Sequence, residues 1–282
     1  MYDIIEKLRN SIIQHGFHNN RIYLMKLYEG DTPDILQDLD SLARNKGYGK
    51  IFAKVPASLI PVFTRKGYRH EATVPGFFRG VDDMVFMAKY FSPERCLEKH
   101  KERIQDIIAI SQEKNTHRLI HNDEESVRIR RCLPSDALQM SLVYKQIFET
   151  YPFPIHDPAY LVDTMRNHGY SFCAMNREEM VALSSSEIDA DSLSVEMTDF
   201  AVLPDWGGRG IAIRLLEQME EEMLRMGMRT AYTIARTLSH GMNKTFGKMG
   251  YTYSGTLTNN SNISGHIESM NVWHKDLKSK WT

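Results

Sequence analysis

At residues 199–212 the chain reads Asp199-Phe200-Ala201-Val202-Leu203-Pro204-Asp205-Trp206-Gly207-Gly208-Arg209-Gly210-Ile211-Ala212. The pattern predicts a strand, a tight glycine loop and the first turn of a helix. Apolar residues then recur at spacings of three and four up to Met223, which predicts an amphipathic helix ending near Gly227. A glycine loop that opens a helix leaves backbone N–H groups unpaired at the positive end of the helix dipole. The stretch therefore predicts a site for a phosphate-bearing ligand.

The glycine spacing excludes two common nucleotide-binding loops. A dinucleotide loop, G-x-G-x-x-G, would need a third glycine at position 213, which is Ile213. A Walker loop needs a Lys-Ser/Thr pair after its last glycine, and none follows Gly210. From Gly207 to Ala212 the loop instead resembles the acyl-CoA loop of the GNAT superfamily of N-acetyltransferases, Q/R-x-x-G-x-G/A, with Gly207 where Gln or Arg is usual. A simple strand-to-helix turn is the alternative that the loop alone leaves open.

Composition narrows the class of protein. The 282 residues are 42% hydrophobic and 25% charged, which is typical of a soluble globular protein of one or two domains. A net charge of −1 favours neither nucleic acid nor an anionic membrane as a partner. The N-terminus lacks an apolar signal core, and no apolar run reaches the roughly 18 residues of a membrane span. Cys96, Cys132 and Cys173 are far apart and odd in number, which predicts a reducing compartment, a cytoplasmic protein and no metal site.

Residues 1–91 predict a smaller α/β domain. The spacing from Phe63 to Tyr68 matches that from Phe246 to Tyr251, so we interpret this domain as a degenerate duplicate of half of the C-terminal domain. Strands are expected at 21–27, 51–55, 71–78 and 84–90, with helices at 34–44 and 56–66.

The duplicate lacks a glycine loop. The acidic residues of the corresponding connection, Tyr28 to Asp34, would repel a pyrophosphate rather than bind one. Glu71, Asp82 and Asp83 are interpreted as solvated strand ends. We therefore expect a structural or interface domain, and a homodimer is one possible use of it.

Residues 92–124 predict a helical linker, with a helix start at Ser92 and an apolar stripe from Ile104 to Ile110. His117 and His121 are four residues apart, as in some helical metal sites, but no third ligand is near them in the sequence. We therefore interpret the polar part around the two histidines as a solvated linker.

Residues 125–282 predict the catalytic domain. Its elements are expected in the order strand, two helices, three strands, glycine loop, helix, strand, helix, two strands, at 126–132, 136–148, 158–166, 171–175, 181–188, 195–202, 211–226, 230–235, 239–249, 251–257 and 267–273. This order resembles that of a GNAT domain throughout, which implies a mixed α/β sheet flanked by helices.

Shorter motifs resemble the β-lysine N-acetyltransferase branch of that superfamily. That branch has the same two-domain layout, and the resemblance implies transfer of an acetyl group from acetyl-CoA to the terminal (N6) amine of β-lysine. The resemblance also implies a product that is a compatible solute in some organisms. The motifs are Pro75-Gly76-Phe77-Phe78, Glu196-Met197-Thr198-Asp199, Ala235-Arg236, Gly241-Met242-Asn243-Lys244-Thr245-Phe246, Asn259-Asn260 and Ser269-Met270-Asn271-Val272-Trp273.

Two carboxylates are candidates for the proton acceptor of this reaction. An amine with a pKa of about 10.4 is almost wholly protonated at neutral pH, so its attack on a thioester needs a base. Glu196 is the first candidate because it lies on the strand that enters the loop, where a GNAT base commonly lies, and Asp199 is the second. Strand alternation places the two on opposite faces unless a bulge intervenes. Each could also be an ordinary strand-end carboxylate in a salt bridge.

The departing thiolate of a GNAT enzyme often takes a proton from a tyrosine, and Phe246 occupies that position here. The thiolate could leave unassisted, since a thiol has a pKa of about 8.5. The side chains that could substitute are Ser239, His240, Tyr251 and Tyr253.

The resemblance also implies binding residues. Those expected at acetyl-CoA are Ala201, Val202, Gly207, Gly208, Arg209, Gly210, Ile211, Ala212, Ser239 and Asn243. Those expected at the small-molecule amine are Tyr151, Arg236, Asn259, Asn260 and Glu268. Ser239 could equally be a helix cap, and Asn259-Asn260 only a turn. Other functions left open are a non-catalytic acyl-CoA-binding module and acetylation of lysine, a polyamine or a protein N-terminus.

Overall fold

One continuous mixed sheet runs through the part of the chain that the computed structural model describes, residues 3–113, 127–167 and 169–277. Its 13 strands lie in the order β1-β2-β3-β4-β6-β5-β12-β13-β11-β10-β9-β8-β7. The strands are β1 (Ile4–Leu8), β2 (Ser11–Gly16), β3 (Arg21–Lys26), β4 (Lys50–Pro56), β5 (Arg69–Phe78), β6 (Asp82–Tyr90), β7 (Arg128–Arg131), β8 (Gly169–Asn176), β9 (Glu179–Asp189), β10 (Ser194–Val202), β11 (Thr230–Arg236), β12 (Thr252–Ile263) and β13 (His266–Asp276).

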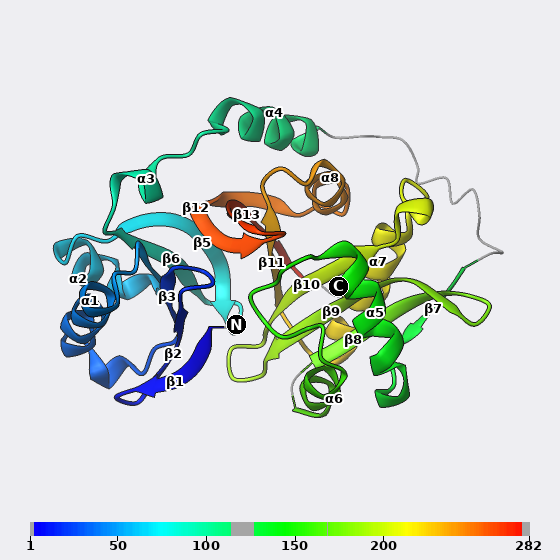
Figure 1. The fold of residues 1–282 in the computed structure, drawn as a ribbon, viewed down its shortest axis with the longest axis horizontal. Coiled ribbons are helices and arrows are strands. Elements are labelled where there is room, and N and C mark those ends of the chain that lie inside the picture. Colours follow the sequence, from blue (N-terminus) through cyan, green and yellow to red (C-terminus); the bar gives the residue numbers. More distant parts are fainter. Residues whose placement is uncertain (1–2, 114–126, 168, 278–282) are drawn as a thin grey trace.

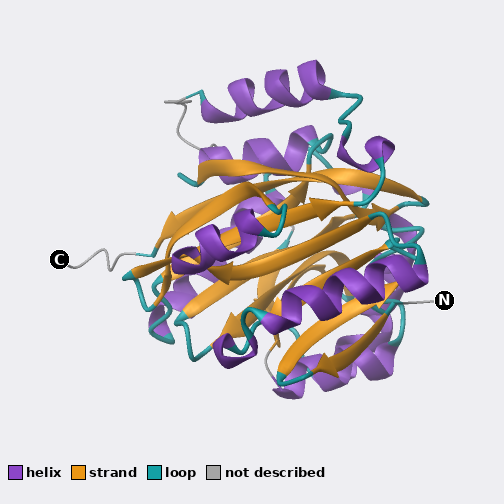
Figure 2. Ribbon diagram, turned by 90° about the vertical axis from the view of Figure 1, so that its left-hand side faces the viewer, coloured by secondary structure: helices purple, strands orange, loops and turns teal. Residues whose placement is uncertain are grey.

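Helices cover both faces of this sheet (Figures 1 and 2). The sheet bends into an arch, with β1 to β6 at one side, β12 and β13 at the top, and β10 to β7 at the other side (Figure 1). Helix α4 forms an outer layer on α8 (Figure 2). The helices are α1 (Asp34–Lys46), α2 (Ile60–Arg65), α3 (Pro93–Cys96), α4 (Lys101–Gln112), α5 (Ala137–Ile147), α6 (Pro158–Asn167), α7 (Ile211–Arg225) and α8 (His240–Lys248).

The predicted mixed α/β sheet with flanking helices is confirmed. From β7 to β13 the elements follow the expected order. Two strands, β1 and β2, were not expected, because the apolar residues of each are adjacent rather than alternating: Ile4 and Ile5 in β1, Ile12 and Ile13 in β2. The helix expected at 56–66 is shorter, since a 3₁₀ turn at Ala57–Leu59 precedes α2. The histidine pair, His117 and His121, lies outside the described residues.

The N-terminal half of the sheet, β1 to β6, repeats the strand pairing of the C-terminal half. The run β3-α1-β4-α2-β5-β6 has the strand pairing of β10-α7-β11-α8-β12-β13: the first two strands are parallel, and the other neighbours are antiparallel. The two halves join edge to edge, where Gly255 of β12 pairs with Ala72 of β5. Because the sheet crosses this seam, the division into 1–91, 92–124 and 125–282 stays a proposal.

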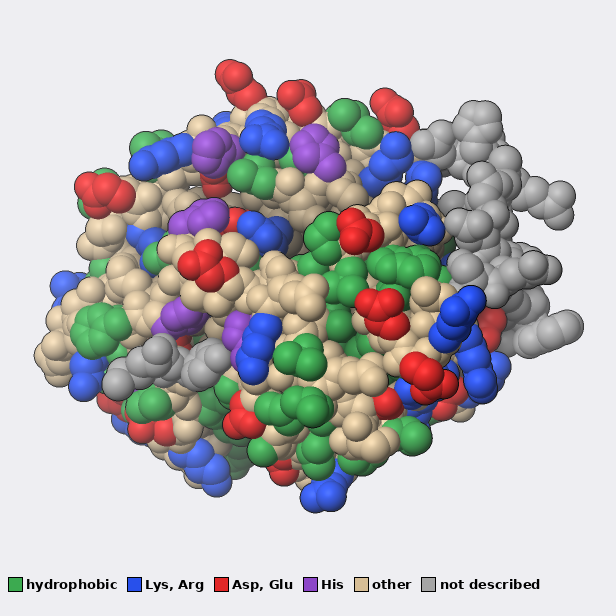
Figure 3. Space-filling model, turned by 45° about the vertical axis from the view of Figure 1, so that its right-hand side comes forward, with side chains coloured by type: hydrophobic (Ala, Val, Ile, Leu, Met, Phe, Trp, Pro, Cys, Tyr) green, Lys and Arg blue, Asp and Glu red, His purple; other side chains and the backbone are tan. Residues whose placement is uncertain are grey.

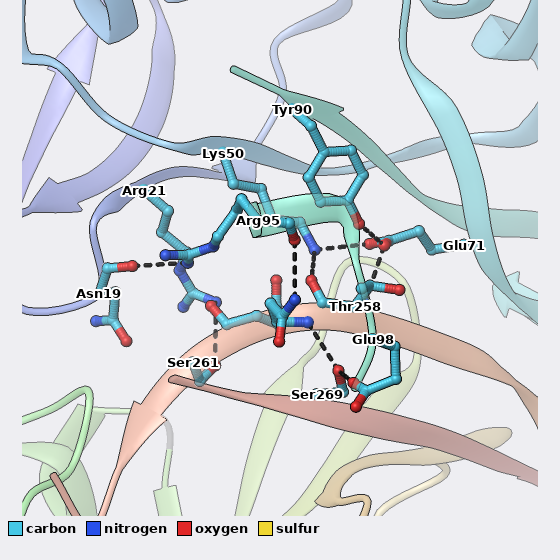
Figure 4. A network of polar contacts seen from close by, with 12 residues as sticks. Asn19, Arg21, Lys50, Glu71, Tyr90, Arg95, Glu98, Thr258, Ser261 and Ser269 are labelled. Carbon is cyan, nitrogen blue, oxygen red and sulfur yellow. Dashed lines mark hydrogen bonds and ion pairs between the residues drawn. The ribbon is translucent and has the colours of Figure 1, made fainter. Parts of the chain in front are cut away.

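Buried polar groups hold the seam together (Figure 4). The Lys50 ammonium is 2.9 Å from a Glu71 carboxylate oxygen and donates to the Thr258 carbonyl at 2.8 Å. The Thr258 N–H donates to the same carboxylate at 2.9 Å. The interpretation of Glu71 as a solvated strand end is therefore wrong, because the pairing of β5 with β12 buries this side chain to 6% exposure.

Substitution of Gly255 by alanine should lower the free energy of unfolding by about 3 kcal/mol. An added Cβ would lie 2.1 Å from the Glu71 carbonyl oxygen and 2.8 Å from Cα of Ala72, and Gly255 has a φ of 146°. Since both neighbours are backbone atoms, the seam must open to admit the methyl group.

Urea denaturation of the variant measures this loss. The matched control is Gly241→Ala, at an exposed helical glycine whose added Cβ would meet no atom within 4 Å. The control should be neutral or slightly stabilising. Equal stability of the two variants would contradict a close-packed seam.

In the described residues, no helix is both long and apolar enough to cross a membrane.

Candidate functional site

Two cavities share a wall on the inner side of the arch. The large cavity has a volume of about 520 Å³ and is lined by β3 and β4 of the N-terminal half and by β9, β10 and β11. The small cavity has a volume of about 170 Å³ and lies between β10, β11 and α8. Both are lined by Tyr151, Thr198, Asp199, Ile234, Ile263 and Met270, which we call the junction.

The small cavity exists because β10 and β11 separate. The two parallel strands pair only from Ser194 to Glu196 with Thr230 to Tyr232. Beyond that point β11 stays paired with β13, whereas the register of β10 against β9 shifts between Thr198 and Ala201. Phe200 and Ala235 then line the opening from its two sides. An opening between parallel strands exposes backbone groups that can pair with an extended ligand.

The glycine loop, Gly207 to Gly210, follows β10 and leads into α7 as predicted. Gly208 and Gly210 have φ values of 77° and 76°, in the left-handed region that favours glycine. An added Cβ at either position would meet no atom within 4 Å, so the loop borders open space. The Arg209 guanidinium lies over the Trp206 ring at 4.8 Å. Unbonded N–H groups of the first turn of a helix favour an anion in such a space.

The bulge in β10 brings the two candidate carboxylates together. Asp199 has a φ of 55°, and this irregularity breaks the alternation that would place it on the face opposite Glu196. Both residues line the large cavity, as does a third carboxylate, Glu187 of β9. The Tyr232 hydroxyl donates to Glu196 at 2.9 Å, and the Tyr151 hydroxyl donates to Asp199.

Burial makes all three carboxylates harder to ionise. It raises the pKa of Glu196 to about 7, against the opposing effects of the Lys54 charge and the Tyr232 hydrogen bond. Burial and the charges of Glu196 and Asp199 raise the pKa of Glu187 to about 8. Burial also raises the pKa of Asp199, against hydrogen bonds from Tyr151 and other hydroxyls. A pKa of about 7 allows Glu196 to take up a proton near neutral pH, which suits general base chemistry.

Side chains of the N-terminal half line the large cavity, which sequence reasoning missed. They are Ile12, Arg21, Tyr23, Met25, Lys26, Phe52 and Lys54. Lys54, a charged residue between apolar positions of β4, is the signal that could have pointed to them.

Four of the predicted binding residues line a cavity, and one of them, Arg236, is described below. Tyr151 lies at the junction, Asn260 lines the large cavity, and Ser239 lines the small one. The alternative interpretation of Asn259-Asn260 as a turn is wrong, since both residues lie within β12, where Asn259 has a φ of 43°. Phe246 is 1% exposed and lines the small cavity, where it packs against Phe200.

Arg236 and Glu268 bind each other. Two hydrogen bonds join the guanidinium to the carboxylate, one of them 2.7 Å long. Arg236 also lines the small cavity, whereas Glu268 borders neither cavity. Their assignment to the amine site stays a prediction.

The side chains of Asn243 and Asn259 form hydrogen bonds within the protein. The Asn243 amide donates to the carbonyls of Arg236 and Ser239, and its oxygen accepts from Asn271 and Trp273. Asn243 is fully buried and thereby fixes the start of α8 against β11 and β13. The Asn259 amide donates to three carbonyls of the chain, those of Glu94, Arg95 and Leu97.

Tyr253 does not line the cavities that Glu196 and Asp199 line. Its hydroxyl bonds Thr256 at 2.7 Å, and its ring packs on Trp273. Of the proposed proton donors to the thiolate, Ser239 is the one that lines the small cavity.

The fold brings two of the cysteines together. The potential ligand atoms of Cys132, Asp136 and Cys173 all lie within 4.8 Å of one another, although the two cysteines are far apart in the sequence. The pairing of β7 with β8 is the reason. Arg130 binds the Asp136 carboxylate through two hydrogen bonds, of 2.7 and 2.9 Å, which occupies that potential ligand.

Comparison with known proteins gives matches over almost the whole chain. The model of the acetyltransferase (GNAT) family matches residues 140–251. A β-lysine N(6)-acetyltransferase from Methanococcus maripaludis is 40% identical over 98% of this chain and 99% of its own. The N-acetyltransferase YodP from Bacillus subtilis is 29% identical over 95% of this chain and 96% of its own. A β-lysine N(6)-acetyltransferase from Methanosarcina mazei is 27% identical over 88% of this chain and 98% of its own.

Proposed function

Because this chain belongs to the GNAT family of acetyl-CoA-dependent N-acetyltransferases, we propose that its acceptor is β-lysine and its product N6-acetyl-β-lysine. The observation that carries the proposal is the junction, where the opening between β10 and β11 meets a cavity lined by three carboxylates. Carboxylates favour an acceptor that carries ammonium groups. The two similar enzymes named for β-lysine support this choice among amines. Production of a compatible solute in the cytoplasm is part of the proposal, and a homodimer stays a prediction.

The chain offers groups that would hold the pyrophosphate and the pantetheine arm of acetyl-CoA. Backbone N–H groups from Gly208 to Ala212 would hold the pyrophosphate at the start of α7. The opening between β10 and β11, lined by Ser239 and Phe246, would hold the pantetheine arm. When bound, acetyl-CoA supplies the thioester that the amine attacks. Figure 3 shows hydrophobic side chains gathered near the middle of one face of the molecule.

In this proposal Asp199 and Glu196 have different tasks. Asp199 lies at the junction and would hold the reacting amine there, with its own orientation fixed by Tyr151. Glu196 would accept the proton of the ammonium group, directly or through one water. A raised pKa, about 7, makes Glu196 a stronger base than an ordinary carboxylate while a large fraction stays ionised at neutral pH. Tyr232 orients it.

Incubation of the full chain with acetyl-CoA and β-lysine tests the function. We expect free thiol to be released in proportion to an acetylated product, and NMR of the product should show the acetyl group on N6. Lysine, spermidine and a peptide with a free N-terminus serve as competing acceptors. Binding of acetyl-CoA without thiol release for any amine would support a non-catalytic acyl-CoA-binding module instead.

A further inference from the structure

A guanidinium from the N-terminal half reaches the large cavity. Arg21 begins β3, is 3% exposed and lines the cavity wall. Its Nη1 donates to the Asn260 carbonyl at 2.6 Å and to the Ser261 hydroxyl at 3.0 Å. The guanidinium also lies 5.4 Å from the ring centroids of Tyr23 and of Phe52. These contacts fix the cation in one orientation before any ligand arrives.

No salt bridge among the described residues neutralises the positive charge of Arg21, although the charge of Asp3 raises its pKa. Within the same part of the chain, its Nε is buried without an acceptor. Burial lowers its pKa to about 10, which leaves it protonated at neutral pH. Two other buried cations, Lys50 and Arg95, lie near enough for the charge of Arg21 to lower the pKa of each, and Lys50 already pairs with Glu71 (Figure 4). A buried, unpaired charge is costly, so an anionic ligand group would account for it.

Asn260 offers a hydrogen-bond acceptor beside the donor groups of Arg21. It is 1% exposed, lines the same cavity, and its side-chain oxygen has no donor among the described residues. A buried carbonyl oxygen without a donor fits an ammonium group of a ligand. Together the two side chains offer a donor for a carboxylate and an acceptor for a neighbouring amine.

The two halves of the sheet contribute charges of opposite sign to this cavity. Glu187, Glu196 and Asp199 come from the C-terminal half of the sheet, and Arg21 comes from the N-terminal half. Lys54 also lines the cavity. Its positive charge lowers the pKa of Glu187 and Glu196, so we count Lys54 with the group of carboxylates. Volumes near 520 Å³ are ordinary for small-molecule sites, so a six-carbon acceptor fits in size.

We propose that Arg21 binds the carboxylate of the acceptor amino acid, while Asn260 accepts a hydrogen bond from the amine nearer that carboxylate. The other amine then lies toward Asp199 and the junction. This inference rests on the proposed function and extends it: the N-terminal half, although it lacks a glycine loop, selects amino acids over plain amines and directs acetylation to the distal amine.

A pair of acceptors tests this on the unmodified chain. β-Lysine and its carboxamide carry the same two amines and differ in the carboxylate. Loss of a charged group that pairs with a buried cation costs two or more factors of ten in affinity, so we expect kcat/KM for the carboxamide to be about 100-fold lower, mainly through KM. Equal values of kcat/KM would overturn the inference and leave the proposed function standing. Failure to acetylate either compound would overturn the proposed function itself.

Arg21→Gln assigns the discrimination to one residue. The 100-fold preference for β-lysine over its carboxamide should fall to about 3-fold or less, because the variant loses the carboxylate contact and keeps the rest of the cavity. Arg21→Lys should restore part of the preference. The ratio reports recognition even where the total activity of a variant falls.

The matched control is Arg44→Gln. Arg44 belongs to the same half and also lies over an aromatic ring, that of Phe91 at 5.5 Å, but it is exposed on α1 and lines neither cavity. The control should keep the full preference. An Arg21→Gln variant that acetylates the carboxamide and still keeps a 100-fold preference would rule out Arg21 as the carboxylate ligand.

Discussion

Replacement of Glu196 by glutamine should lower kcat/KM for the acceptor by about 10²- to 10⁴-fold, the usual contribution of a general base. Glutamine keeps the shape of the side chain and can still meet the Tyr232 hydroxyl, but it cannot take a proton. Affinity for acetyl-CoA should change by less than about 2-fold, because Glu196 lines the large cavity and not the small one. Steady-state kinetics and calorimetric titration with acetyl-CoA measure the two effects separately.

The pH profile sharpens this test. The pKa of Glu196 is raised to about 7, so below that pH the base becomes protonated and kcat/KM should fall tenfold for each pH unit. Above it the rate should level off. The glutamine variant should lack this acid limb. Because Glu187 and Asp199 titrate in the same cluster, the observed midpoint belongs to the group of three.

Two further variants make the result decisive. Glu179→Gln changes an exposed glutamate at the start of β9 and should leave both kinetics and the acid limb unchanged. Asp199→Asn should mainly raise KM for the acceptor, if Asp199 holds the amine at the junction. Unchanged turnover in Glu196→Gln, or loss of the acid limb in Asp199→Asn alone, would reassign the base.

Gly210→Glu should abolish measurable binding of acetyl-CoA, with a loss of affinity of at least about 100-fold. The added side chain would enter the open space beside the loop and bring a negative charge to the site proposed for the pyrophosphate. Two unit charges about 4 Å apart near a protein surface repel by about 4 kcal/mol, which is nearly three factors of ten in Kd. A residue with a side chain is also strained at a φ of 76°.

Gly47→Glu controls for that strain and for the charge. Gly47 ends α1 with a φ of 70°, an added Cβ would meet no atom within 4 Å, and it borders neither cavity. The two variants should lose similar stability in thermal unfolding, whereas calorimetry should detect acetyl-CoA binding only for Gly47→Glu. Retention of acetyl-CoA binding by Gly210→Glu would contradict a pyrophosphate site at this loop.

The sequence alone was sufficient to predict the features that depend on residues close together in the chain. The glycine loop, the amphipathic α7 and the order of elements from β7 to β13 follow from local periodicity and from the conformations that glycine permits. Glu196 and Asp199 became candidates in the same way, because they lie just before the loop. Even so, only the bulge in β10 decided that both face one cavity, and periodicity had predicted opposite faces.

The tertiary structure alone decided which distant residues meet. Arg21 and Asn260 are separated by more than 200 positions, and nothing local in either strand indicates the contact between them. Asn243 and Asn259 carry side chains suited to binding a ligand, yet backbone carbonyls and neighbouring side chains engage them. The physical reason is common to these cases. The role of a polar side chain depends on the group that it contacts. Across the seam between β5 and β12, sheet pairing brings that group from a distant part of the sequence, and periodicity along one segment does not predict such a pairing.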